Sequence, residues 1–310
     1  MELHSTIYIA GHHGLVGSNL YRYLTSLGYQ NIVTRSSKEL DLRNQQAVND
    51  FFKEVQPEYV FLAAAKVGGI GANMTYPATF IYDNIMIEAN VIHASYLYGV
   101  KKLLFLGSSC IYPKDTHIPI QESSLLTGPL EKTNQAYAIA KIAGIEMIRS
   151  YRKQYGVHFI SAMPTNLYGV GDTYDHYHSH VIPSLIIKMH QAKINNQKEV
   201  QLWGTGRPKR EFMFAFDLAK HLHELMLHYD EDDIINIGTG QDISIRDLSV
   251  IISNVVGFKG DIIFDTSMPD GTMEKTLDIT KMLRYTNVSH TTLEEGIQKA
   301  YQDFLKNVTT

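Results

Sequence analysis

The chain is nearly free of thiols: it has 310 residues and one cysteine, Cys110, so it cannot form an internal disulfide. This is typical of a protein from a reducing compartment. The longest apolar runs, such as VFLAAA at 60–65 and KLLFLG at 102–107, are far shorter than the ~18 residues of a membrane-spanning helix. The N-terminal stretch MELHSTIYIAG lacks the basic and apolar regions of a secretory signal. We therefore expect a cytoplasmic protein that does not enter a membrane.

The sequence also lacks concentrated charge of either sign. Its net charge is −4, and the basic residues form no block that alternates with aromatic residues, which excludes nucleic acid as an expected partner. The 14 histidines are scattered, and their densest group, DHYHSH at 175–180, lacks the companion ligands of a typical zinc site. We therefore expect no metal. The 44% hydrophobic content suits one large or two modest globular domains.

Strand and helix patterns alternate through the first half of the chain. The sequence predicts strands at 6–11, 31–35, 59–65, 102–109 and 157–163, and helices at 14–29, 44–55, 77–98 and 134–155. This alternation predicts an α/β fold with a Rossmann-type, doubly wound parallel sheet covered on both faces. We place this domain at 1–170. A smaller C-terminal α/β lobe is expected at 171–310, with the chain free to cross between the two.

The looser pattern beyond residue 170 still predicts regular elements. We expect strands at 200–203, 235–240 and 261–265, and helices at 180–194, 244–256 and 291–306. No Pro/Gly/Ser linker separates the two parts, so the lobes are expected to share an interface. A cleft between lobes is a common place for a small ligand.

The first strand-to-helix turn reads GHHGLVG at 11–17. Gly11 permits a tight turn, Gly14 allows close approach of a pyrophosphate, and Gly17 lets the helix lie against the strand. The N-terminus of that helix would then face the phosphates. A packing turn that binds nothing would share this glycine triplet, but its position in the first βαβ unit favours a dinucleotide.

The segment after the second strand, TRSSK at 34–38, indicates which dinucleotide is bound. An acidic residue here favours NAD, whereas a basic residue favours the 2′-phosphate of NADP. The segment supplies Arg35 and Lys38, with no carboxylate before Glu39. Surface charges placed by chance would look the same. We expect NADP(H).

The helix at 134–155 carries Tyr137 and Lys141, which are four residues apart and therefore share one helix face. An ammonium beside a phenol should lower the phenol pKa from ~10 toward the range of a working acid or base. Many such pairs are merely exposed side chains. Here the pair follows a strand that ends at Ser108, so we expect the three side chains to converge at the carboxyl edge of the sheet.

These features resemble an extended short-chain dehydrogenase/reductase. The chain is more specifically similar to the GDP-L-fucose synthase family through AAAKVGGI (63–70), GSSCIYPK (107–114), AYAIAKIAG (136–144), MPTNLYG (163–169), SHVIP (179–183), WGTG with REF (203–212) and PDGT (269–272). Members act on a GDP-4-keto-6-deoxy-mannose, invert C3 and C5, and reduce C4 with NADPH. The resemblance also implies a homodimer formed through the helices at 77–98 and 134–155.

The resemblance assigns a role to each catalytic candidate. Tyr137 would protonate the C4 oxygen, Ser108 would hydrogen bond to that oxygen, and Lys141 would bind the nicotinamide ribose and tune the tyrosine. Cys110 would remove the protons at C3 and C5, and His180 would return a proton from the other face. A 4-ketone acidifies both neighbouring C–H bonds, so one set of donors serves both reactions. If these two residues are not catalytic, Cys110 is simply a small buried hydrophobic residue, and His180 is one of several histidines in a polar loop.

The binding residues complete the predicted site. The cofactor site comprises Gly11, His13, Gly14, Leu15, Val16, Gly17, Arg35, Ser37, Lys38, Asp41, Leu42, Ala63, Ala64, Ala65, Lys141, Pro164, Asn166, Leu167 and His180. The substrate site comprises Ser108, Ser109, Cys110, Asn166, Lys188, Trp203, Arg210, Asp270 and Lys275. Lys188 and Arg210 would hold the diphosphate, Trp203 would pack on the ligand, and Asp270 would bind sugar hydroxyls. Trp203 would equally suit a core position.

Several positions depart from the family pattern. His13 and Ser37 replace arginines, FAFD at 214–217 replaces HVDD, and Met273 and Glu274 replace a basic pair. The loop at 172–180 is unusually rich in histidine and tyrosine. An alternative is therefore a C4-only reductase of a GDP-4-keto-heptose from a surface-polysaccharide pathway. A third hypothesis is a silent dinucleotide-binding sensor, which the intact Ser108, Tyr137 and Lys141 argue against.

Overall fold

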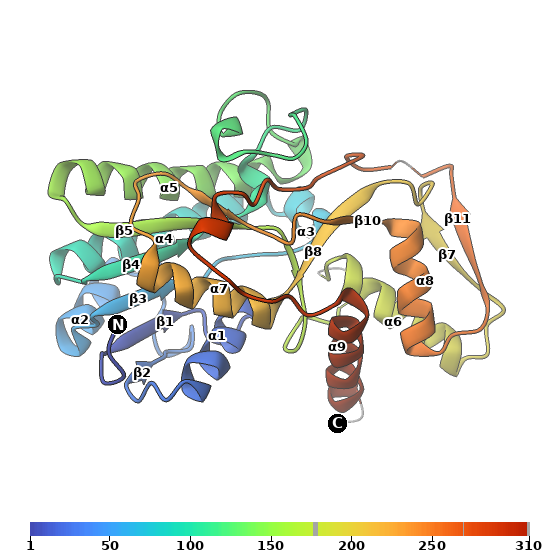
Figure 1. The fold of residues 1–310 in the computed structure, drawn as a ribbon, viewed down its shortest axis with the longest axis horizontal. Helices are drawn as coiled ribbons and strands as arrows, with labels where there is room; N and C mark the ends of the chain where they lie inside the picture. Colours follow the sequence, from blue (N-terminus) through green and yellow to red (C-terminus); the bar gives the residue numbers. More distant parts are fainter. Residues whose placement is uncertain (176–178, 269, 309–310) are drawn as a thin grey trace.

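A six-stranded parallel sheet forms the larger part of the molecule. The computed structural model describes residues 1–175, 179–268 and 270–308 (Figure 1). The strand order is β2-β1-β3-β4-β5-β9, and all neighbouring pairs are parallel. The strands are β1 (Ile7–Ala10), β2 (Ile32–Val33), β3 (Tyr59–Leu62), β4 (Lys102–Leu106), β5 (His158–Pro164) and β9 (Ile235–Ile237). The expected α/β Rossmann-type fold is confirmed.

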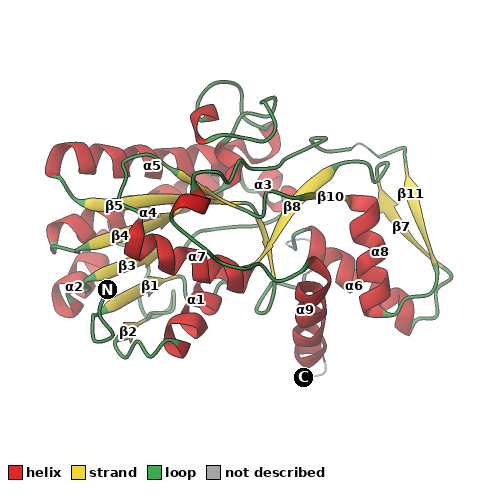
Figure 2. Ribbon diagram, viewed as in Figure 1, coloured by secondary structure: helices red, strands yellow, loops and turns green. Residues whose placement is uncertain are grey.

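Side chains that alternate along each strand supply two separate hydrophobic clusters, one on each face of the sheet. In β1, Tyr8 belongs to the first cluster, whereas Ile7 and Ile9 belong to the second. The helices α2 (Gln45–Val55), α4 (Pro77–Leu97) and α5 (Gln135–Tyr155) contribute to the first cluster. The helices α1 (Leu15–Ser26) and α7 (Ala215–His228) contribute to the second. Figure 2 shows these helices flanking the strands, as a sheet buried on both faces requires.

A third hydrophobic cluster organises the smaller lobe. Its helices are α6 (Val181–Ile194), α8 (Ile245–Val256) and α9 (Leu293–Val308), and its two-stranded sheet pairs β7 (Glu199–Trp203) with β11 (Asp261–Asp265). A three-stranded sheet, β10-β8-β6, lies between the two parts (Figure 1). Its strands are β6 (Asn166–Tyr168), β8 (Lys209–Phe214) and β10 (Asp242–Ser244).

The chain passes between the two parts more than once. It enters the smaller lobe after β6, returns through β8 to form α7 and β9, and then leaves again for α8. Several elements beyond residue 170, among them α7 and β9, therefore pack in or on the larger sheet. The division of the chain at residue 170 stays a prediction.

Short elements complete the structure. They are α3 (Ile70–Thr75) and the 3₁₀ helices η1 (Ser109–Ile111), η2 (Glu122–Ser124), η3 (Lys132–Asn134) and η4 (Met282–Arg284). Within the described ranges, every helix is too short or too polar to cross a membrane.

The turn from β1 to α1 is built from backbone in close contact. Gly11 has φ +91°, and a Cβ at this position would lie 2.6 Å from the Ala64 nitrogen. A Cβ at Gly17 would lie 2.2 Å from the Gly11 oxygen, whereas one at Gly14 would lie 3.4 Å from that same atom. Packing therefore requires glycine at 11 and 17. At position 14, packing would also allow a residue with a side chain.

We expect Gly17→Ala to lower the free energy of unfolding by about 1–3 kcal/mol, because the new methyl group has no space against the backbone of the turn. Gly14→Ala, in the same turn, is the matched control. It should lose no more than about 1 kcal/mol, the cost of a poorer N-cap residue. Urea denaturation would measure both. Equal losses in the two variants would contradict this account of the turn.

Candidate active site

The serine and the cysteine of GSSCIYPK lie in one tight turn at the carboxyl end of β4. Ser108 is the N-cap of η1, and its Oγ accepts a hydrogen bond from the Cys110 backbone nitrogen at 3.2 Å. Ser109 is buried, and Cys110 is partly buried. This bond folds the Ser108 hydroxyl back over the start of η1, toward the backbone of Cys110.

Helix α5 brings the tyrosine and the lysine to the same edge of the sheet. The Ser108 hydroxyl and the Tyr137 phenol are hydrogen bonded. One turn further along the helix, the Lys141 Nζ donates to the Leu106 carbonyl at the end of β4, at 2.9 Å. The ammonium lies 5.8 Å from the centroid of the Tyr137 ring. The structure therefore brings together Ser108, Cys110, Tyr137 and Lys141.

The structure corrects one expectation about this group. The pKa of Tyr137 is raised well above its ordinary value, not lowered. Burial is the main cause, the nearby Cys110 and Glu88 side chains add to it, and the hydrogen bond with Ser108 opposes it. The phenol is therefore protonated at neutral pH, as a proton donor must be.

One of the side chains that add to this rise, Glu88 of α4, was not a predicted site residue. Its Oε1 lies 3.0 Å from the Lys141 Nζ, and the two side chains are only 2% and 1% exposed. Burial raises the pKa of the Glu88 carboxyl, and the Lys141 ammonium opposes that rise. The sequence signal was a single acidic residue inside the apolar stretch IMIEANVIHA. A buried carboxylate needs a partner, but the sequence does not show which cation supplies it.

The glycine turn and its neighbours can accommodate a dinucleotide. Gly14 caps α1 without a side-chain hydrogen bond, so the first backbone N–H groups of the helix are left for a ligand. The loop 63–65 touches this turn through Ala64. Asn84 of α4 fixes the end of the loop, because it accepts from the Lys66 nitrogen at 2.8 Å and donates to the Lys66 carbonyl at 3.0 Å.

The segment after β2 presents its basic side chains to solvent. Arg35, Ser37 and Lys38 are all exposed. The carboxylate of Glu39 instead accepts from both the nitrogen and the hydroxyl of Ser36, each at 2.7 Å. The nearby acid is thus engaged within its own loop. The basic groups remain available to a phosphate.

The other predicted cofactor residues lie in the glycine turn, in the segment after β2, and on β5 and β6. His13 is exposed in the glycine turn, while Leu15 and Val16 begin α1. Asp41 pairs with Arg43 at 2.9 Å, and the Leu42 carbonyl accepts from Asn90 at 2.9 Å. Pro164 ends β5, and Asn166 and Leu167 lie on β6, where the Asn166 amide donates to the Glu211 carbonyl at 2.9 Å.

The predicted substrate residues of the smaller lobe each bind a neighbouring segment rather than one another. Lys188 of α6 donates to the Gln201 carbonyl of β7 at 3.1 Å, and Trp203, at the end of β7, is 71% exposed. An exposed indole does not fit a core role. In the next turn, the Asp270 carboxylate accepts from the nitrogen and hydroxyl of Thr205 at 2.8 and 2.7 Å.

Arg210 and Lys275 lie near this turn. The Arg210 guanidinium donates to the Thr272 carbonyl at 2.5 Å, and Lys275 is partly buried in the segment that follows. His180 is the exposed N-cap of α6. Residues 176–178 of the histidine-rich loop and Pro269 of PDGT lie outside the described residues.

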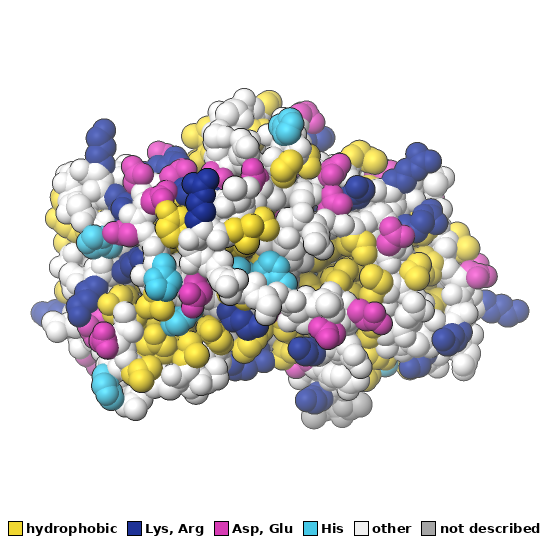
Figure 3. Space-filling model, viewed as in Figure 1, with side chains coloured by type: hydrophobic (Ala, Val, Ile, Leu, Met, Phe, Trp, Pro, Cys, Tyr) yellow, Lys and Arg dark blue, Asp and Glu magenta, His cyan; other side chains and the backbone are white. Residues whose placement is uncertain are grey.

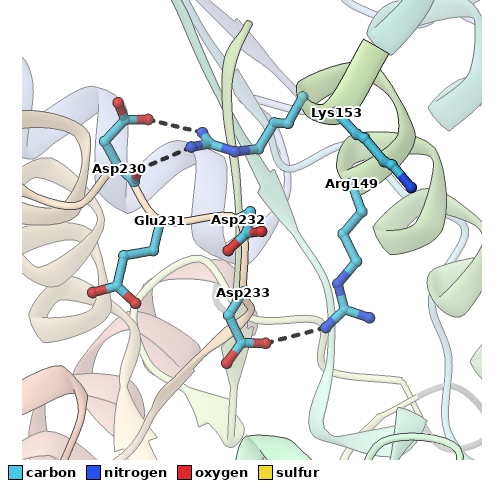
Figure 4. A pocket seen from close by; sticks show the side chains of 7 residues that line it. Arg149, Lys153, Asp230, Glu231, Asp232 and Asp233 are labelled. Atoms are coloured by element: carbon cyan, nitrogen blue, oxygen red, sulfur yellow. Dashed lines mark hydrogen bonds and ion pairs between the residues drawn. The ribbon is translucent and has the colours of Figure 1, made fainter. Parts of the chain in front are cut away.

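A charged surface hollow of about 890 Å³ lies away from these residues (Figure 4). It is lined by α5 residues Arg149, Arg152 and Lys153 and by residues 230–233, which join α7 to β9. Its arginines are paired with Asp230 and Asp233 at 2.8 and 3.1 Å. The hollow lies beside the start of β5, at the opposite edge of the sheet from Ser108. It therefore takes no part in the candidate site.

The chain is similar to known proteins over nearly its whole length. Residues 7–238 match the NAD dependent epimerase/dehydratase family. A GDP-L-fucose synthase of Sinorhizobium fredii is 53% identical over 302 residues, which cover 97% of this chain and 96% of that protein. A putative GDP-L-fucose synthase 2 of Arabidopsis thaliana is 50% identical over 308 residues, with 99% and 94% covered.

A solved structure is similar over the same nearly full length of the chain. It is a GDP-mannoheptose C4 reductase from Campylobacter jejuni with NADP bound. It has a TM-score of 0.91 and 40% identity, and the match covers 98% of this chain and 99% of that one.

We expect Lys141→Met to lower the free energy of unfolding by about 3–5 kcal/mol at neutral pH, because it leaves Glu88 buried without its cation. An unpaired buried carboxyl has a raised folded-state pKa, so the loss is full above that pKa and disappears as pH falls below the unfolded value of ~4.3. Urea denaturation across pH would test this. The double variant Lys141→Met/Glu88→Gln should recover most of the loss at pH 7. A loss that does not change with pH would contradict the ion pair.

Proposed function

The chain belongs to the NAD dependent epimerase/dehydratase family and, within it, to the GDP-L-fucose synthase family, and on this basis we propose that it is an NADP-dependent nucleotide-sugar oxidoreductase. It reduces the C4 ketone of a GDP-4-keto-deoxy sugar and epimerises C3 and C5. The observation that carries this proposal is the convergence of Ser108, Cys110, Tyr137 and Lys141 at the carboxyl end of β4. The family resemblance expected from the motifs is confirmed.

In the reduction, Tyr137 acts as the acid. Its phenol is protonated at neutral pH, and burial raises its pKa further, so it can give a proton to the C4 oxygen as negative charge develops there. Ser108 hydrogen bonds to the same oxygen. NADPH, when bound, supplies the hydride. The uncapped N-terminus of α1 would hold its pyrophosphate, Arg35 and Lys38 its 2′-phosphate, and Lys141 the nicotinamide ribose.

In the epimerisation, the ketone that accepts hydride also acidifies the C3 and C5 hydrogens. Cys110 removes these protons as a thiolate, and His180, at the N-cap of α6 in the smaller lobe, returns a proton from the opposite face of the sugar. Ser108 and Tyr137 stabilise the intermediate enolate with the same donors that they use in reduction. One site can therefore perform both reactions on one carbonyl.

The smaller lobe binds the nucleotide-sugar. Lys188 and Arg210 contact the diphosphate, the exposed face of Trp203 packs against the ligand, and Asn166 with Ser109 extends the site toward the sugar. Asp270 and Lys275 border it. Asp270 also fixes the turn after β7 through Thr205, so its carboxylate shapes the pocket besides meeting the sugar. Lys188, where the family has arginine, keeps the charge but not the forked geometry.

A second function is a C4-only reductase of a GDP-4-keto-heptose in surface-polysaccharide synthesis. The similarity to the Campylobacter jejuni GDP-mannoheptose C4 reductase supports it. In that case, Cys110 and His180 are retained as binding residues. The sensor hypothesis is disfavoured, because a protonated Tyr137 held by Ser108 has no use in a protein that only binds a dinucleotide.

Assembly and location follow from the same membership. We propose a cytoplasmic homodimer in which α4 and α5 of each copy form a four-helix bundle. Apolar side chains on these helices remain exposed, among them Tyr82, Ile85 and Ile139. Acidic and basic side chains are interspersed over the face in Figure 3, which favours a small-molecule ligand over nucleic acid.

Tyr137→Phe should slow NADPH oxidation in the presence of a GDP-4-keto sugar by at least about 10²-fold, because it removes the acid and leaves the ring. Binding of NADPH, measured by fluorescence, should change little. The matched control is Tyr155→Phe, which removes an exposed hydroxyl from the far end of the same helix. An undiminished rate in Tyr137→Phe would contradict the proposed reduction.

Epimerisation can be tested in D₂O without NADPH, using GDP-4-keto-6-deoxy-mannose. We expect deuterium at C3 and C5, detected by NMR, since proton removal needs only the ketone and a base. Cys110→Ala should lower the incorporation at both positions by about 10²-fold or more. Reduction without any deuterium incorporation would instead support the C4-only heptose reductase.

A further inference from the structure

We propose that Glu88 is a positioning residue for the reduction: it holds the Lys141 ammonium at the floor of the site and balances its charge beside Tyr137. This inference rests on the proposed function. The ammonium has three hydrogens to donate, and two of its partners are the Leu106 carbonyl at 2.9 Å and the Glu88 carboxylate at 3.0 Å. Two fixed partners leave the lysine little freedom to turn away from the cofactor side.

The packing of α5 is adapted to this carboxylate. Tyr137, Lys141 and Gly144 share one face of the helix. A Cβ at Gly144 would lie 2.7 Å from the Glu88 Oε2 and 2.6 Å from the Phe105 Cζ. Glycine is a poor residue inside a helix, so its presence here needs a reason. It provides the space in which Glu88 reaches Lys141.

The compensation is specific to this pair. In the part of the chain that the structure describes, neither carboxylate oxygen of Glu88 has a hydrogen-bond donor besides the ammonium. The Glu88 carboxylate is therefore balanced by Lys141, and the Lys141 ammonium is held by Glu88 and by the Leu106 carbonyl. Neither side chain could change position or charge without leaving the other buried and unbalanced.

Three further side chains of α4 hold other segments at this edge of the sheet. Asn84 fixes the loop after β3 through Lys66. Asn90 binds the Leu42 carbonyl at 2.9 Å, and Asp83 pairs with Arg43 at 3.1 Å. Each of them fixes a segment next to the proposed cofactor site. Glu88 does the same for the catalytic lysine.

The charge that faces Tyr137 comes from three elements. Cys110 of η1 and Glu88 of α4 raise its pKa, and the Lys141 ammonium of α5 lies 5.8 Å from its ring. While Glu88 is ionised, the ammonium and carboxylate nearly cancel. Without Glu88, the positive charge would act on the phenol alone and lower its pKa. Glu88 thus keeps Tyr137 protonated over a wider range of pH.

Glu88→Gln tests this, because it keeps the shape of the side chain and removes its charge. We expect kcat at pH 7 to fall roughly 10- to 100-fold, because Lys141 loses the partner that fixes its position. Since reduction needs the protonated phenol, activity also falls as pH rises through the Tyr137 pKa, which lies above its ordinary value. That alkaline limb of the kcat profile should move to lower pH by about one unit. Ser95→Ala, a buried polar change on α4 that affects only a bond to Val91, should match the wild type. An unchanged Glu88→Gln profile would overturn the proposal.

A second variant and a second measurement guard against misfolding and against an unsuitable substrate. Gly144→Ala displaces the Glu88 carboxylate without removing it and should shift the profile in the same direction; a folded variant with wild-type kinetics would overturn the proposal. The ¹³Cζ NMR titration of Tyr137, assigned with Tyr137→Phe, needs no turnover. Its pKa should fall in Glu88→Gln even if no GDP-4-keto sugar is reduced, a result that would overturn only the proposed function. An unchanged titration would overturn the role of Glu88.

Discussion

The ion pair between Lys141 and Glu88 is the contact on which the rest of the site depends. A buried ammonium must be neutralised and hydrogen bonded. Here its partners come from the end of β4 and from α4, while the lysine itself comes from α5. The three elements must therefore meet at one point. This contact fixes the position of α5, and with it Tyr137, relative to Ser108 and Cys110 in the turn that follows β4.

Much of this architecture could be predicted from the sequence. The apolar strands, the glycine turn and the four-residue spacing of Tyr137 and Lys141 are local patterns, and parallel strands bring their carboxyl ends to one edge. Glu88 could not be placed in the same way, because its partner lies 53 residues along the chain on another helix. The direction of the Tyr137 pKa shift was missed mainly because the sequence does not show how deeply the phenol is buried. The negative charge of Glu88, which adds to the rise, was missed as well.

The smaller lobe was harder to predict for a related reason. Strands β6 and β10 have three residues each, and their pairing with β8 depends on chain crossings that leave no periodic signal. Links such as Thr205 to Asp270 join loops that lie far apart in the sequence. Some of the positions that depart from the family pattern, Met273 and Glu274, lie in the segment that follows β11 of this lobe. Under the proposed function, the choice of sugar depends on this lobe, whereas the chemistry depends on the regular sheet.

The most direct test of the account is the fate of the hydride. The enzyme would be incubated with a GDP-4-keto sugar and NADPH deuterated at the transferable C4 position, and the product analysed by NMR. Reduction at the edge formed by Ser108, Tyr137 and Lys141 predicts one deuterium on C4 of the sugar, in a single configuration. NADPH consumption with no deuterium at that carbon would contradict the account.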